Sequence, residues 1–226
     1  MEDYASAFHG ERNAQLGKLM NPSPITERSL LETIWYRPTE TLGFILQFCP
    51  KKYVTPLLVL GGISRAIGRA ADKGYGDTME LWAVLTLAIV LGGLFGWMGY
   101  YMYAWGMRVT GNWLNGKANT EQFRTVLAWS LVPAIGSLVL LIPELIIIGE
   151  DLFKSEPDIY SNAIAYSYIL FGILEMTLGI WSIVILVKGT AIIQKFSVWK
   201  SILNVFLPGI IIAAPLILIA LVASMF

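Results

Sequence analysis

Three ionisable residues stand inside long apolar stretches of the sequence, where charged side chains are rare: Arg65, Glu144 and Glu175. A charge at the centre of a bilayer costs roughly 2.5–3.5 kcal/mol even on lenient insertion scales, so such residues usually have a partner or a function. At ~1.5 Å per helical residue, Arg65 lies ~9 Å and Glu144 ~8 Å from the outer ends of their stretches. Because the two share a level, we predict an Arg65–Glu144 ion pair that ties two helices together.

Glu175 differs because it stands at the middle of its stretch, ~18 Å from either end, and ~9 Å in depth from Arg65. An intramembrane carboxylate without a close cation is typical of a proton- or cation-binding site that lines a polar cavity. The alternative is a structural glutamic acid that fixes helix packing by a hydrogen bond, for example to Tyr168 or a serine. Both interpretations stay open at this stage.

The sequence offers little for enzyme chemistry. It contains one histidine, His9, and one cysteine, Cys49. It has no Gly-rich phosphate loop, no His-Glu-x-x-His motif and no credible Ser/His/Asp set. We therefore predict that the protein is not an enzyme and has no cofactor or metal centre. Sixteen basic residues balance sixteen acidic ones, so the composition gives no indication of nucleic-acid binding.

The elements that position these residues must be membrane-spanning helices. Hydrophobic residues make up 56% of the 226 residues and charged residues 14%, whereas soluble domains carry about 25% charged residues. A span needs ~20 mostly apolar residues. We predict an all-α, polytopic membrane protein whose five transmembrane helices cover residues 53–71, 81–107, 123–149, 163–187 and 202–225.

The distribution of charge predicts the orientation. The residues before the first span and the connections Arg108–Arg124 and Lys188–Lys200 hold most of the basic residues, whereas the other connections are acidic. Basic connections stay in the cytoplasm, so we predict a cytoplasmic N-terminus and an outside C-terminus. Residues 1–50 form a cytoplasmic leader with one or two short amphipathic helices, and residues 51–226 form the transmembrane domain. The run 40–48 either lies in the headgroup plane or docks on the bundle.

Small residues at steps of three and four share one helix face and let helix backbones approach closely. The predicted packing residues are Gly92, Gly96, Gly99 and Gly106 in the second span and Gly172 and Gly179 in the fourth. Prolines interrupt the third and fifth spans, as ordinary kinks or as functional breaks. They are Pro133, Pro143, Pro208 and Pro215.

Three stretches of the sequence have a more specific character. The first, Trp35-Tyr36-Arg37-Pro38-Thr39-Glu40-Thr41, leads into a short apolar helix and then the first span. The second is the basic entry into a span with an early proline at 123–133, and the third runs from Trp181 to Lys200. With the five-span plan, they resemble the membrane domain of the Yip1 family in its prokaryotic branch. The resemblance covers about residues 30–226, and Trp35, Arg37 and Pro38 form its family-like motif.

The resemblance implies a scaffold or binding protein in membrane organisation or trafficking that acts through its cytoplasmic face and helix contacts. Eukaryotic members sit in Golgi and endoplasmic-reticulum membranes and bind Rab-type GTPases. Their Asp-Leu-x-Gly-Pro signature is absent here, which disfavours Rab binding and favours a prokaryotic cell (inner) membrane. The expected partners are anionic lipid headgroups at the cytoplasmic face, a second copy or another membrane protein. The alternative function is an ion, proton or lipid transporter or channel centred on Glu175.

Overall fold

The computed structural model describes residues 25–156 and 161–223, with side chains up to residue 215. Over these residues the chain is helical and contains no β-strand, as predicted. The α-helices are α2 (Leu30–Tyr36), α3 (Pro38–Phe48), α4 (Val54–Asp72), α5 (Leu81–Trp113), α6 (Thr120–Ser130), α7 (Val132–Ile135), α8 (Ser137–Ile147), α9 (Asn162–Gln194) and α10 (Val198–Ala223). Two 3₁₀ turns, η1 (Tyr75–Asp77) and η2 (Gly149–Phe153), lie at the same end of the bundle and pack together.

Length and composition identify the helices that can cross a bilayer within the described part of the chain. The 33-residue helices α5 and α9 qualify, as does the Val198–Pro215 portion of α10. Helix α6 and the segment Val132–Ile147 qualify together as one span bent by 41°. Helix α4 is not among them. The structure therefore supports a multi-pass protein with three candidate spans, or four with the bent pair, where the sequence predicted five.

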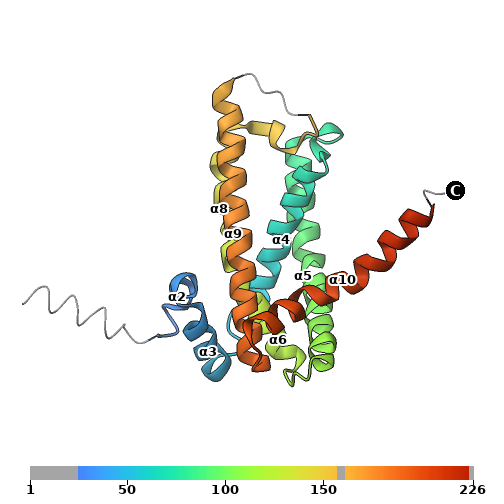
Figure 1. Cartoon of the computed structure of the whole chain (residues 1–226). Helices are drawn as coiled ribbons and strands as arrows, with labels where there is room; N and C mark the ends of the chain where they lie inside the picture. The colour runs from blue at the N-terminus through green and yellow to red at the C-terminus, as the bar shows by residue number, and fades with distance from the viewer. Residues whose placement is uncertain (1–24, 157–160, 224–226) are drawn as a thin grey trace, which may run out of the picture.

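Helices α4 and α5 run side by side and form the most extensive helix contact of the bundle (Figure 1). A Cβ added to Gly92 would lie 2.8 Å from the carbonyl oxygen of Gly62, and one added to Gly96 would meet the Gly62 Cα. The two backbones approach directly because these positions carry only hydrogen. The Tyr100 hydroxyl adds a hydrogen bond to the carbonyl of Gly61, at 3.1 Å.

The third predicted span is broken between α6 and α7, next to Pro133. Proline has no amide hydrogen and interrupts the helical hydrogen-bond ladder. The amide of Ala134 donates to Ser182 Oγ of α9 at 3.0 Å, and its carbonyl accepts from Ser64 Oγ of α4 at 3.1 Å. Side chains from two neighbouring helices thus satisfy the backbone groups at the bend, as a helix break in a membrane requires.

Helices α2 and α3 dock on the bundle, which is one of the two placements that the sequence left open. They join the hydrophobic core around α6 and the end of α9. The Thr125 hydroxyl donates to the Pro50 carbonyl at 2.8 Å, and Trp129 Nε1 donates to the Lys52 carbonyl at 3.2 Å. These bonds fasten the linker from α3 to α4. The fully buried apolar side chains of α2 and α3 are Leu30, Ile34, Leu42 and Ile45.

Helix α10 starts against α5 and α9 and then leans away from the other helices (Figure 1). Near its start, Val205 is buried and its carbonyl accepts a hydrogen bond from the Tyr103 hydroxyl at 2.6 Å. Further along, Ile210 and Ile212 are 54% and 66% exposed. Among the residues of α10 whose side chains the structure describes, up to residue 215, the buried ones therefore lie in its first part.

Candidate functional site

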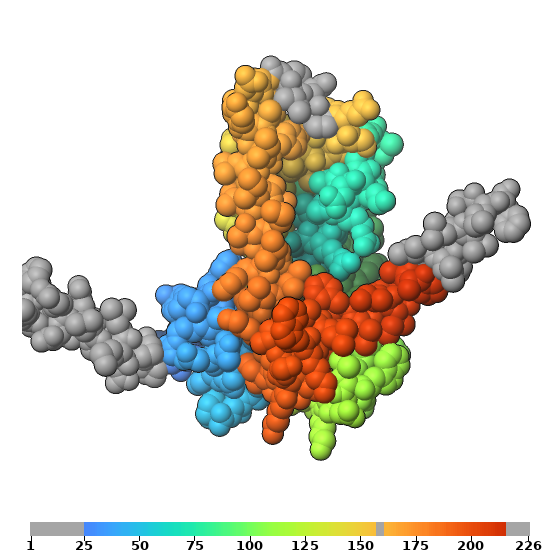
Figure 2. Space-filling view, in the orientation of Figure 1, coloured from blue at the N-terminus to red at the C-terminus, as the bar shows by residue number. Residues whose placement is uncertain are grey.

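An acidic cavity of about 250 Å³ lies between α4, α8 and α9. The molecular surface is hollowed between α9, in orange, and α4, in teal (Figure 2). Leu152 and Phe153 of η2 contribute apolar walls at one end. The polar lining residues are Ser64, Asp72, Ser137, Glu144 and Glu175.

Two of the predicted intramembrane residues, Glu144 and Glu175, line this cavity together. Glu144 is only 3% exposed, whereas Glu175 is exposed. Glu175 lies close enough to both Glu144 and Asp72 for the carboxylate charges to interact. Carboxylates that share a small intramembrane cavity can hold a proton or a cation. Within the described ranges no three Asp, Glu, His or Cys side chains are grouped so as to hold a metal ion.

The third predicted intramembrane residue, Arg65, faces away from this cavity and lines the groove between α4, α5 and α10. The expected Arg65–Glu144 ion pair is not formed among the ion pairs of the described chain. Arg65 interacts instead with the Tyr100 hydroxyl of α5. A helix turns by ~100° per residue, so Ser64 points to α8 while Arg65 points to the other side of α4. Equal depth did not ensure contact, because the two side chains lie on different faces.

The hydroxyl partners suggested for Glu175 do not cap it, and the buried Tyr168 hydroxyl has no hydrogen-bond partner within the described residues. The Ser64 and Ser137 hydroxyls lie 3.0 Å apart, and each is within hydrogen-bond distance of the Ala134 carbonyl, so their two hydrogens are shared among these three oxygens. The buried Tyr168 hydroxyl interacts electrostatically with Asp151 and Lys154 rather than with Glu175. Glu175 therefore faces the cavity without a hydroxyl cap from Tyr168.

The predicted packing glycines have different surroundings. Gly92 and Gly96 lie against α4, and a Cβ on Gly106 would be 3.3 Å from Pro208 of α10. A Cβ added to Gly99, Gly172 or Gly179 would meet no atom within 4 Å. These three glycines are not at helix contacts in this chain, because Gly99 and Gly179 line cavities and Gly172 is exposed.

The motif that carries the family resemblance holds α2 and α3 on the bundle. The carbonyl of Trp35 accepts a hydrogen bond from Trp181 Nε1 of α9 at 3.1 Å. Arg37 forms an ion pair with Glu40, one turn further along. Pro38 is buried at the first position of α3, where a missing amide hydrogen costs nothing.

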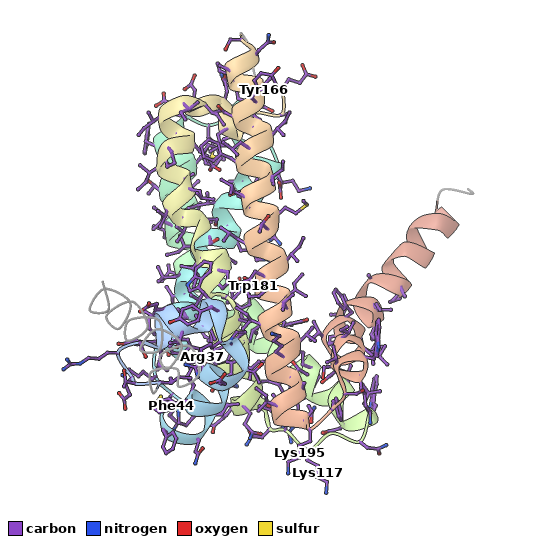
Figure 3. The ribbon with its side chains drawn as sticks, turned by 60° about the vertical axis from the view of Figure 1, so that its left-hand side comes forward. Arg37, Phe44, Lys117, Tyr166, Trp181 and Lys195 are labelled. Carbon is purple, nitrogen blue, oxygen red and sulfur yellow. The ribbon has the colours of Figure 1, made fainter. Side chains whose placement is uncertain are left out.

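Exposed basic residues gather at this end of the molecule. Figure 3 shows Lys117 and Lys195 close together at the end opposite to Tyr166. Nearby, Lys52 pairs with Glu27, and their hydrogen bond raises the pKa of the lysine. We call this end the basic platform, and its exposed basic residues are Arg28, Lys51, Arg108, Lys117, Lys188 and Lys195.

A buried polar cluster beneath the platform was missed by the sequence reasoning. Asn204 Nδ2 donates to the Met107 carbonyl at 2.9 Å and to Thr110 Oγ1 at 2.8 Å. Gln194 Oε1 accepts from the amide of Ala118 at 2.9 Å. These bonds join α10 to α5, and α9 to the connection between α5 and α6, at a level where the sequence suggested only basic loops. The signal was an asparagine within the apolar run that opens the last span.

These features define a multi-pass helical membrane protein with an acidic cavity and a basic end. The model of the Yip1 domain matches residues 33–221, so the chain belongs to the Yip1 domain family. This match confirms the family predicted from the motifs. No curated protein and no solved structure matches the chain.

Proposed function

We propose that the chain is a Yip1-type scaffold or binding protein in membrane organisation or trafficking, and that it is not an enzyme. The observation that carries the proposal is the docking of α2 and α3, whose fully buried side chains join the core of the bundle. The basic platform is therefore held in a fixed shape. A preformed surface binds its partner without the cost of ordering flexible segments.

We propose further that α4 is a fifth span, that the platform faces the cytoplasm and that the C-terminus lies outside. Helix α4 has 19 residues, or ~28 Å at ~1.5 Å per residue, close to the ~30 Å of a hydrocarbon core. Absence of the Rab-associated signature favours the inner membrane of a prokaryotic cell. A single cysteine at Asn112, in a Cys49→Ser background, should react with an impermeant maleimide only from the cytoplasmic side. One at Ser155 should react only from outside.

In this orientation the platform favours anionic headgroups. Each Lys or Arg near a membrane surface contributes about 1 kcal/mol to attraction by anionic lipids. A second copy or another membrane protein that engages the exposed face of α10 would be held beside these lipids. The scaffold hypothesis therefore predicts that copies of the chain cluster in membranes rich in anionic lipid.

The test uses full-length protein labelled at Asn112→Cys, in the Cys49→Ser background, with donor or acceptor dyes. In phosphatidylglycerol liposomes we expect energy transfer above the value for random proximity. A Lys117→Gln/Lys195→Gln variant should lower it, and the matched control Lys73→Gln, on the outer connection, should not. Energy transfer at the random value in every lipid mixture would refute self-association. Equal transfer in neutral and anionic lipid would refute the role of the platform.

A second candidate function is proton or monovalent-cation transport, and the cavity shared by Glu144 and Glu175 favours it. Purified protein in liposomes with an internal pH-sensitive dye would show wild-type flux that a Glu175→Gln variant loses. Glu121→Gln, an exposed glutamate at the platform end, is the matched control. Absence of flux from the folded, inserted wild type would refute this candidate for the ions tested.

A further inference from the structure

A second and larger cavity, a groove of about 1,100 Å³, runs between α4, α5 and α10. It is as large as the ~300–1,000 Å³ pockets that hold small molecules in proteins. Its lining is apolar along most of α5 and α10, for example at Phe95, Met102 and Ile211. The two cationic side chains in the lining, Arg65 and Arg69, are both on α4.

Arg65 and Arg69 are placed to act together. They are one helical turn apart on the same face, ~6 Å along the axis, and both are exposed. In the described chain neither forms an ion pair with an acidic residue. By helix rise they lie ~4–10 Å from the end of α4 at Asp72, and long arginine side chains near the end of a span extend toward the headgroup level. Guanidinium groups bind phosphate through paired charge-assisted hydrogen bonds.

We propose that this groove binds a phospholipid, with the phosphate held by Arg65 and Arg69 and the acyl chains lying along α5. Charge complementarity favours a phospholipid as the occupant. Its phosphate supplies a negative counter-charge, which neither arginine has within the described chain. An apolar helix from a second copy would cover the guanidinium groups without compensating them, and buried unpaired charge is costly.

The glycines of α5 shape the path of the acyl chains. Gly99 lines the groove, and a Cβ added to it meets no atom within 4 Å. The absence of a side chain there leaves room for an apolar ligand rather than for a neighbouring helix. Gly99→Leu should therefore fill part of the groove without disturbing the packing of α4 on α5. Gly172→Leu, on the exposed face of α9 with equally open surroundings, is the matched control.

The experiment measures binding of dioleoylphosphatidylglycerol to the delipidated full-length protein in detergent by native mass spectrometry. We expect one saturable lipid per chain. Arg65→Gln/Arg69→Gln should weaken its binding at least tenfold, as expected for lost charge-assisted hydrogen bonds. Arg65→Lys/Arg69→Lys keeps the positive charge but not the paired hydrogen bonds, so it should cause a smaller loss of lipid affinity. This variant replaces the glutamine variant as the test if the latter fails to fold. Lys73→Gln removes an exposed cation from the same end of α4 without changing the groove lining, and this variant should bind as the wild type does.

Gly99→Leu should also weaken lipid binding, whereas Gly172→Leu should not. Equal binding by the wild type and the folded arginine variants would overturn the proposal. Competition by inorganic phosphate together with indifference to Gly99→Leu would show a phosphate site instead. The same mass spectra report whether the protein is a dimer. A groove variant that changed the amount of dimer but not the amount of bound lipid would show that a second copy occupies the groove. Arg65 and Arg69 lie near the end of α4 at Asp72, whereas the groove itself continues along α5 to Trp113 at the platform end. The arginine variants therefore leave the basic platform unchanged, and their result is separate from the test of the scaffold proposal.

Discussion

The direct contact of the α4 and α5 backbones makes Gly96 intolerant of even one added carbon. A Cβ at this position would meet the Cα of Gly62 and lie 3.0 Å from its carbonyl carbon. The obstructing atoms are backbone, so no side chain can rotate away to make room. Gly96→Ala therefore forces the two helices apart along their contact.

The expected magnitude follows from two opposing effects. Overpacking by an added methyl group typically costs about 1–3 kcal/mol, and the backbone contact places Gly96→Ala at the upper part of that range. Replacing glycine by alanine inside a helix contributes about 0.8–1.0 kcal/mol in the other direction. The net destabilisation is thus about 1–2 kcal/mol. In Gly172→Ala only the higher helix propensity of alanine acts, because no atom lies within 4 Å of the added Cβ. This variant should therefore be about 1 kcal/mol more stable than the wild type.

The assay is reversible unfolding of the purified protein in mixed micelles, with the free energy of unfolding compared between the two variants. A difference of about 2–3 kcal/mol changes the unfolding equilibrium by roughly 30- to 150-fold, since about 1.4 kcal/mol is tenfold. Equal stabilities of Gly96→Ala and Gly172→Ala would refute the close α4–α5 contact. A stabilised Gly96→Ala variant would refute it as well.

Three further predictions concern single contacts. Ser182→Ala leaves the amide of Ala134 without its side-chain acceptor at the helix break and should cost about 1–3 kcal/mol of unfolding free energy. Asn119→Ala removes the capping box of α6 and should cost about 1 kcal/mol in the same assay. Hydrogen bonds from Ser155 lower the pKa of Asp77, so this contact is present above the ordinary pKa of an aspartate and is lost as the pH falls through the lowered value. Thermal unfolding from neutral pH to about pH 3 should show an acid destabilisation that Asp77→Asn reduces.

Features with a strong local signal were predicted well from the sequence. Apolar runs gave the helices α4 to α10 to within several residues, because a membrane requires long uninterrupted stretches. Pro133 marked the break of the third span, because proline lacks the amide hydrogen of the helical ladder. The other three prolines lie inside helices that continue past them, Pro143 in α8 and Pro208 and Pro215 in α10. The motif around Trp35 and Pro38 predicted the family that the match to residues 33–221 then showed.

Features that depend on helix rotation or on distant segments were not predicted. Depth along a helix follows from residue counts, but the direction of a side chain depends on how each helix is turned, and this is why Arg65 and Glu144 do not meet. Helix α9 continues to Gln194, beyond the predicted end at 187. The extension brings Gln194 to Asn204 and α5, and no local pattern indicated that a polar cluster would be completed there.

Helix α4 shows why a test of hydropathy alone does not settle the number of spans. Arg65, Arg69 and Asp72 give it too little apolar character to be recognised as a span by composition. A charged side chain in a membrane is costly when it faces lipid, and much less so when it faces a polar cavity or a counter-charge. Asp72 lines the acidic cavity on one side of α4, and the two arginines line the groove on the other. Asp72 thus faces a polar cavity, and a lipid phosphate in the groove would supply the counter-charge of the two arginines. The charges that lower the hydropathy of α4 are therefore compatible with the proposed fifth span.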